Sequence, residues 1–304
     1  MIRLRMSIVS ALAVVMALLA STLLFAPAAN ANPAPNQYVA LGDSYASGMG
    51  ADVYKSPYAV NVGNADLGSY EEGTAIPDTG CWRNTHAYPN QIAAHTGYNL
   101  AFRACAGATI WEVIHGKSGE TSQLDSLSPE TELVTITAGG IDAEFMGVME
   151  CIITSYCRPD SPAIQHSSHM IANELPANYD WLLNEVKAKA PNARIAMFGY
   201  ATTVPEPLNT QIYMQPSEQS LAMNLRNNVN QAMANAAARH GVQYVDPFAA
   251  GSPFNRADAS ADVLWNSSAT WALRVEVAGI GSSWHPTRKG HDYAAQVITS
   301  ALNL

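Results

Sequence analysis

The 304-residue sequence has few charged side chains and no cluster of basic ones. Charged residues make up 13%, with 16 Lys and Arg against 25 Asp and Glu, and the formal net charge is -9. Proteins that bind nucleic acid need a basic surface to contact the phosphates, so this composition argues against a nucleic-acid partner. Hydrophobic residues make up 48%, which is enough for a large core and excludes a disordered chain.

Two motifs of common enzyme and metal sites are also missing. The sequence contains no G-x-S-x-G, the turn that carries the nucleophile in α/β-hydrolases. It contains no C-x-x-C pair, and its histidines do not lie beside its cysteines at the spacing of zinc ligands. His166 and His169 form an H-x-x-H pair without a third ligand nearby, so we interpret them as part of a solvated loop. We therefore expect no metal and no cofactor.

Beyond the N-terminus, no segment is long and apolar enough to span a membrane. At the N-terminus, residues 6–25 form an apolar run after two arginines, and residues 29–31 (A-N-A) have the small-x-small pattern of a cleavage site. A membrane-spanning anchor is the alternative, because the run approaches the roughly 20 residues that cross a bilayer. The cleavage pattern favours a signal peptide over residues 1–31. We expect a secreted, extracellular protein with no stable membrane anchor, in which residues 32–304 form a single domain.

The four cysteines fit such an oxidising compartment. Four cysteines allow three pairings, of which the two sequential pairs are the most economical. Each bridge would contribute roughly 2–4 kcal/mol to stability by restricting the unfolded chain. The cysteines are Cys81, Cys105, Cys151 and Cys157.

Five short apolar runs, bounded by Gly, Pro or polar residues, are typical of buried parallel strands. Helical patterns lie between them, and the clearest begins at Ser217, which we predict as its N-cap, and ends at Gly241. Strands that alternate with helices predict an α/β fold with helices on both faces of a parallel sheet. The predicted strands are residues 37–41, 98–102, 133–137, 194–198 and 242–245; the predicted helices are residues 86–95, 175–190, 217–241 and 288–302; and the long loops, expected to face substrate, are residues 60–80 and 249–283.

A serine follows the first predicted strand, in residues 42–45 (G-D-S-Y). Ligands of open parallel sheets bind outside the carboxyl ends of the strands, so Ser44 lies where a nucleophile would be useful. The turn after it offers free N–H groups to a developing negative charge, although an ordinary capping serine would look the same.

A histidine precedes the last predicted helix, in residues 282–286 (S-S-W-H-P). A serine hydroxyl needs a base to take its proton, and histidine is the usual base near neutral pH. Among the eight histidines, His285 is the best candidate, and we assign a structural role to His291, which lies inside the helix.

In combination, these two motifs resemble the SGNH (GDSL) hydrolases, and more closely their secreted, disulfide-bearing lipase/esterase branch. Residues 103–109 (R-A-C-A-G-A-T), with residues 81–83 and 88–89 before them, resemble the block that carries the oxyanion glycine. Residues 135–142 (T-I-T-A-G-G-I-D) resemble the G-G-N-D block of the family. The motifs occur in the family's order over nearly the whole mature chain. The resemblance implies a flavodoxin-like, three-layer α/β/α sandwich with a mostly parallel five-stranded sheet.

The resemblance also implies roles for individual residues. Ser44 would be the nucleophile, His285 the general base, and the N–H groups of Ser44 and Gly107 two donors of the oxyanion hole. The protein would be a monomeric esterase or lipase that cleaves a small-molecule or lipid ester through an acyl-enzyme, without a cofactor. The disulfides implied are Cys81–Cys105 and Cys151–Cys157.

The sequence departs from the family at the third oxyanion donor, where Ile141 replaces the Asn of G-G-N-D. An aliphatic side chain cannot donate, and losing one such donor typically lowers turnover by roughly 10²–10³-fold. Asn64 or Asn84 could supply the missing donor; otherwise we expect a slow or specialised esterase. The alternatives are an acyltransferase that uses the same acyl-enzyme and a non-catalytic binding protein on a degenerate hydrolase scaffold.

The second departure is the acid that orients the histidine, because Ser282 stands where many members have Asp. Some members of the resembled branch use a backbone carbonyl instead, which can still accept the Nδ1–H bond and fix the tautomer. We therefore predict a Ser–His dyad oriented by the Ser282 carbonyl. Asp246 and Asp292 are the alternative partners.

Overall fold

The computed structural model describes residues 37–51, 80–117, 119–154, 157–201, 215–255 and 285–304. The strands are β1 (Gln37–Gly42), β2 (Asn99–Phe102), β3 (Thr131–Thr137), β4 (Arg194–Phe198) and β5 (Gln243–Val245). The helices are α2 (Ser44–Ser47), α3 (Tyr88–Thr96), α4 (Ile110–His115), α5 (Phe145–Thr154), α6 (Pro162–His169), α7 (Leu175–Lys189), α8 (Pro216–His240) and α10 (Arg288–Leu302), with short helical segments η1 (Gln123–Ser126), η2 (Met170–Glu174) and η3 (Pro253–Asn255).

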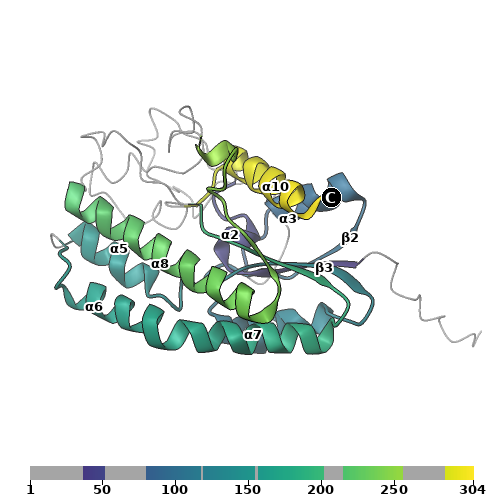
Figure 1. The fold of residues 1–304 in the computed structure, drawn as a ribbon, viewed down its shortest axis with the longest axis horizontal. Helices are drawn as coiled ribbons and strands as arrows, with labels where there is room; N and C mark the ends of the chain where they lie inside the picture. The colour runs from purple at the N-terminus through teal and green to yellow at the C-terminus, as the bar shows by residue number, and fades with distance from the viewer. Residues whose placement is uncertain (1–36, 52–79, 118, 155–156, 202–214, 256–284) are drawn as a thin grey trace, which may run out of the picture. The chain divides into compact units, whose positions relative to one another are not determined.

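The strands form one parallel sheet in the order β2-β1-β3-β4-β5. Helices α3 and α10 lie over one face, and α7 and α8 lie over the other (Figure 1). The α/β fold with a five-stranded parallel sheet, predicted from the alternating pattern, is therefore confirmed. The order of the strands reverses between β1 and β3, and such a switch point leaves a crevice at the carboxyl ends of the two strands.

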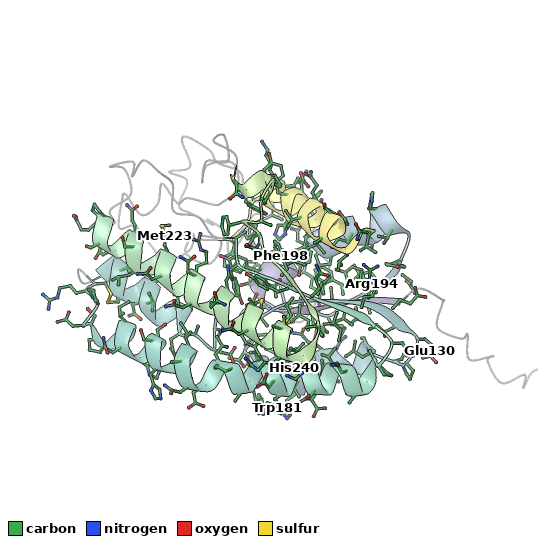
Figure 2. The ribbon with its side chains drawn as sticks, in the orientation of Figure 1. Glu130, Trp181, Arg194, Phe198, Met223 and His240 are labelled. Atoms are coloured by element: carbon green, nitrogen blue, oxygen red, sulfur yellow. A yellow bond between two sulfur atoms is a disulfide. The ribbon has the colours of Figure 1, made fainter. Side chains whose placement is uncertain are left out.

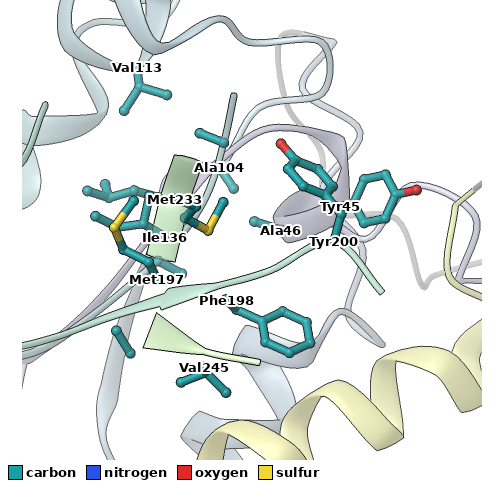
Figure 3. Close-up of a cluster of buried hydrophobic side chains, with 14 of the residues drawn as sticks. Tyr45, Ala46, Ala104, Val113, Ile136, Met197, Phe198, Tyr200, Met233 and Val245 are labelled. Carbon is teal, nitrogen blue, oxygen red and sulfur yellow. The ribbon is translucent and has the colours of Figure 1, made fainter. Parts of the chain in front are cut away.

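The central strands are apolar because both of their faces are covered. Residues 38–41 of β1 are fully buried, and β3 is buried along all but one of its positions. The core continues from the sheet to α8, whose Met233 belongs to the same buried cluster as Ile136, Met197 and Val245 (Figure 3). This rigid layer fixes the positions of the loops that follow β1, β3 and β4.

Two local predictions were wrong. Helix α8 has Gln215 rather than Ser217 as its N-cap, because Pro216 suits the first helical position and Glu218 completes a capping box with Gln215. His166 and His169 lie on helix α6, not in a loop.

The four cysteines form the disulfides Cys81–Cys105 and Cys151–Cys157, the pairs that the family resemblance implied. Among the described residues, no helix has both the length and the apolar character that a membrane span requires. The predicted signal peptide, the first long loop except Gly80, and the second beyond Asn255 lie outside the described residues.

Candidate active site

A close backbone approach positions the nucleophile turn at the end of β1. Gly42 has φ +138°, and a Cβ atom there would lie 2.1 Å from the carbonyl oxygen of Thr137 at the end of β3, so only glycine fits. The next amide, of Asp43, donates to the same carbonyl oxygen at 2.9 Å. Ser44 then begins helix α2.

Gln123 holds the same turn from η1. Its Oε1 accepts from the Gly42 N–H at 2.8 Å, and its Nε2 donates to the Gly42 carbonyl at 2.9 Å. This buried amide satisfies both backbone groups of the glycine. Gln123 belongs to none of the sequence motifs, so only the folded structure reveals its part.

Ser44 and His285 meet at the carboxyl ends of the strands although 241 positions separate them. The Nε2 atom of His285 lies 2.7 Å from the Oγ atom of Ser44, and each residue is 8% exposed. The His285 ring also lies 5.2 Å from the ring of Tyr45. The two residues predicted as nucleophile and base are thus at hydrogen-bonding distance in a largely water-excluded position.

The group that would orient His285 is only partly described. Ser282 lies outside the described residues. Asp246 is exposed, and its Oδ1 accepts from the Phe248 N–H at 2.9 Å. Although Asp246, Asp292 and His285 are all described, the structure has no hydrogen bond or ion pair between the histidine and either carboxylate.

The predicted oxyanion donor Gly107 lies in a loop that is held firmly at the end of β2. The disulfide joins Cys105 to Cys81, and Arg83 Nε donates to the Ala104 carbonyl at 3.1 Å. Gly107 itself has φ +71°, a conformation that favours glycine. Within the described ranges, neither its N–H nor that of Ser44 has a protein acceptor, so both remain available to a developing oxyanion.

Ile141 lies in the wall of the same pocket as Ser44 and Gly107. Asn84, one of the two side chains considered as a replacement donor, is fully buried, and its Oδ1 accepts from the His86 N–H at 2.7 Å. It does not belong to the described residues that line the pocket, and Asn64 lies outside the described part of the chain.

Asp43 and Tyr200 form a second polar pair beside the nucleophile. The Tyr200 hydroxyl donates to Asp43 Oδ2, and the Tyr45 N–H donates to Oδ1 at 2.9 Å. Burial raises the pKa of Asp43 to about 7, although both hydrogen bonds favour its charged form and oppose this shift. Burial also raises the pKa of Tyr200 well above its ordinary value. Tyr200 follows β4 and belongs to no motif, so no pattern in the sequence marks it.

A largely apolar pocket of about 430 Å³ opens beside Ser44 and His285. Helices α5 and α8 supply much of its wall, and Met223, labelled in Figure 2, lies on the N-terminal half of α8. The apolar wall residues, beyond Ile141, are Met49, Trp82, Ala106, Phe145, Met146, Met149, Ala222, Met223, Leu225 and Val229.

A metal site is not evident in the part of the chain that the structure describes. No group of three or more His, Cys, Asp or Glu side chains there is arranged to hold an ion. His166, one half of the H-x-x-H pair, instead places its Nε2 3.3 Å from Glu144 Oε1.

Comparison with known proteins gives a consistent group of relatives. The GDSL-like Lipase/Acylhydrolase family model matches residues 40–293. Lipase 1 of Streptomyces coelicolor is 31% identical over 260 residues, which cover 84% of this chain and 83% of the relative. The crystal structure of phospholipase A1 from Streptomyces albidoflavus superposes with a TM-score of 0.66 at 28% identity, and covers 88% of this chain and 99% of that one. An extracellular lipase from Streptomyces rimosus gives a TM-score of 0.65 at 27% identity, with the same coverage.

Proposed function

The chain belongs to the GDSL-like lipase/acylhydrolase family, and from that premise we propose that it hydrolyses carboxylic esters through an acyl-enzyme on Ser44. His285 takes the serine proton as Oγ attacks the ester carbonyl, and it returns that proton to the leaving alcohol. Water, deprotonated by the same histidine, then releases the acid. No step requires a metal or a cofactor.

The observation that carries this proposal is the 2.7 Å contact between Ser44 Oγ and His285 Nε2. A capping serine would have no need of an imidazole contributed by the other end of the chain. A degenerate binding scaffold would likewise have no need of a buried nucleophile–base contact. The contact therefore favours an enzyme over a non-catalytic binding protein.

In our proposal, the tetrahedral intermediate is stabilised by two backbone N–H groups, those of Ser44 and Gly107. Two donors instead of three make the enzyme slow relative to a family member with Asn, because Ile141 offers no hydrogen. The Ser282 carbonyl orients the imidazole through Nδ1. These assignments rest on the family motifs and on the free N–H groups described above.

The acyl chain of the substrate occupies the apolar pocket between α5 and α8 in this proposal. Its volume of about 430 Å³ lies within the range of ordinary ligand sites, and its wall is rich in methionine, which adapts to flexible chains. A profile of p-nitrophenyl esters of increasing chain length should therefore reach its maximum beyond acetate. Leu225→Phe, which narrows the pocket, should move that maximum toward shorter chains.

Export completes the proposal: residues 1–31 are removed as a signal peptide, and residues 32–304 act outside the cell as a monomeric single domain. The two disulfides and the extracellular lipase among the relatives support this location. N-terminal sequencing of the protein from culture medium should begin at residue 32. A protein retained in the membrane with an intact N-terminus would contradict it.

A serine-reactive fluorophosphonate tests the enzyme directly. The wild-type protein should be labelled once and should cleave a chromogenic ester, whereas Ser44→Ala should do neither. Absence of labelling in a folded, disulfide-intact sample would favour a binding protein. An acyltransferase would be labelled equally, but product analysis with a competing alcohol would show ester exchange in preference to free acid.

A further inference from the structure

Tyr200 lines the pocket, and its position is fixed by several contacts. It is 6% exposed and follows β4 by two residues. Asn230 of α8 holds its backbone on both sides, because the Tyr200 N–H donates to Asn230 Oδ1 at 2.8 Å and Asn230 Nδ2 donates to the Tyr200 carbonyl at 2.9 Å. The Tyr45 ring meets the Tyr200 ring edge-on at 4.8 Å (Figure 3). The phenol therefore has little freedom to turn.

The Tyr200 hydroxyl joins two loops that come from different strands. It accepts from the Gly140 N–H at 2.7 Å, in the loop after β3, and it donates to Asp43 Oδ2, in the turn after β1. The direction of both bonds is determined: a backbone N–H can only donate, so the single phenol proton goes to the carboxylate. A Cβ atom at Gly140 would lie 3.1 Å from this hydroxyl, which leaves little room for another arrangement.

Asp43 transmits this contact to the nucleophile. Its second oxygen accepts from the Tyr45 N–H at 2.9 Å and so caps the helix that begins with Ser44. One chain of hydrogen bonds therefore runs from Gly140 through the phenol and the carboxylate to the residue after Ser44. This chain of hydrogen bonds links the loop that carries Ile141 to the turn that carries Ser44. The N–H and Oγ groups of Ser44 act together on the substrate in the proposed function.

On the basis of the proposed function, we propose that the Tyr200 hydroxyl is a positioning group for ester hydrolysis, which holds the nucleophile turn and the Gly140 loop in the geometry for attack and does so most firmly while Asp43 is charged. The charged carboxylate accepts the phenol proton in a charge-assisted hydrogen bond. Protonation of Asp43 removes that charge, so the bond to the phenol weakens or reverses its direction and the turn is held less firmly.

The titration of Asp43 is set by groups on several elements. Because the pKa of Asp43 is raised to about 7, the charge on its carboxylate changes near neutral pH, where groups at active sites are often tuned to titrate. Tyr200 and the Tyr45 N–H favour the charged carboxylate, and Asp142 opposes it. The titratable side chains around it are Tyr88 on α3, Asp142 after β3, Tyr179 on α7 and Tyr200 after β4, with His285 on the far side of Ser44.

Tyr200→Phe removes only the hydroxyl, and its kinetics test the proposal. We expect kcat to fall by about 10- to 100-fold, as for a small misplacement of reacting groups, with KM changed by less than about threefold. The acidic limb of the kcat profile should move up by about one pH unit, because the charged form of Asp43 loses a hydrogen bond. The carboxyl carbon of Asp43, followed by ¹³C NMR, should show the same shift independently of activity.

Tyr38→Phe is the matched control. Tyr38 is also fully buried and its hydroxyl makes one hydrogen bond, at 2.7 Å to Thr135 Oγ1, within the sheet. This variant should lose stability but keep kcat and the acidic limb of the wild type. Should Tyr200→Phe not fold, Asp43→Asn provides the second test, because it should lower kcat comparably and remove the Asp43 component of the pH profile.

A Tyr200→Phe enzyme with wild-type kcat and an unmoved acidic limb would overturn the inference, as would an equal shift of the limb in Tyr38→Phe. The failure of the proposed function has a different signature. In that case the wild type itself would neither react with fluorophosphonate nor cleave an ester, whereas the ¹³C titration would still report whether Tyr200 controls Asp43.

Discussion

At the scale of single residues, the substitution of Ile141 for the family's Asn has the clearest expected effect. Its side chain lies in the pocket wall beside the two proposed oxyanion donors, where it contributes apolar surface and no hydrogen. The loop that carries it is already held, because the Gly140 N–H is bound by the Tyr200 hydroxyl. The backbone at this position is thus fixed, but the isoleucine side chain supplies no hydrogen-bond donor.

Ile141→Asn should raise kcat by tenfold or more, since a third oxyanion donor is typically worth roughly 10²–10³-fold in turnover. Initial rates on a short-chain ester would measure this change. Ile141→Val, which has no donor, should leave the rate near the wild-type value. An unchanged or lower rate in a folded Ile141→Asn protein would contradict the role assigned to this position.

If Ser44 and His285 act as a dyad without a carboxylate, neutralising a nearby aspartate should leave most of the activity. Asp246→Asn keeps the oxygen that accepts from the Phe248 N–H, so the fold should be retained. It and Asp292→Asn should each keep most of the kcat on a chromogenic ester. A loss of about 10³-fold or more from either would indicate a triad, as when the Asp of a triad is neutralised.

At the scale of elements, Glu218 connects α8 to the Cys151–Cys157 disulfide beside the pocket. Glu218 is buried, with 3% of the residue exposed. Its Oε1 accepts from the Cys157 N–H and its Oε2 from the Gln215 N–H, each at 2.8 Å. The side chain therefore caps its own helix and holds the end of the disulfide loop that follows α5.

Glu218→Gln should lower the free energy of unfolding by about 1–3 kcal/mol, because the new amide presents hydrogens to one of two buried N–H donors. Thermal unfolding followed by circular dichroism would measure the loss. Because α5 and α8 both line the pocket, the preference among ester chain lengths should also broaden. Glu174→Gln, at an exposed glutamate, should change neither property, and an unchanged Tm in Glu218→Gln would remove the role given to this carboxylate.

The sequence predicted the elements of this fold unevenly, for physical reasons. Each strand prediction agrees within two residues because a strand buried on both faces must be apolar along its length. The start of α8 was misplaced because proline and glutamate at the first turn outweigh a serine cap. Helices α2, α4, α5 and α6 were not predicted, since short helices give weak periodicity, although the nine-residue α3 was predicted over residues 86–95.

Site residues that belong to sequence motifs could be predicted, whereas residues that reach the site only through tertiary contacts could not. Ser44, Gly107 and His285 follow strands or precede a helix at positions that their motifs mark. Tyr200 and Gln123 act through contacts made across 157 and 81 positions of the chain, and single buried side chains of this kind leave no pattern in a sequence.

At the scale of the whole molecule, the burial of Asp43 couples stability to pH. Its pKa is raised from 3.8 to about 7, so the folded state binds more protons than the unfolded state between these two values. The stability that this group contributes is fully present below about pH 4 and is lost as the pH rises through about 7.

Comparison with Asp43→Asn isolates this coupling from all other titrations. The unfolding free energy of the wild type minus that of the variant should decrease as the pH rises from 4 to 8, by an amount on the order of 2–4 kcal/mol. Urea denaturation at a series of pH values would give both curves. A difference that stays level across this range would show that Asp43 titrates normally.

The contact between Ser44 and His285 spans 241 positions, and this separation has a consequence for the cell that makes the enzyme. In the proposed mechanism, a polypeptide that has not yet been synthesised as far as residue 285 has its serine but lacks the imidazole. Such a partial polypeptide should not attack esters by this mechanism. The proposed activity would therefore begin only after residue 285 has been made and has joined the fold.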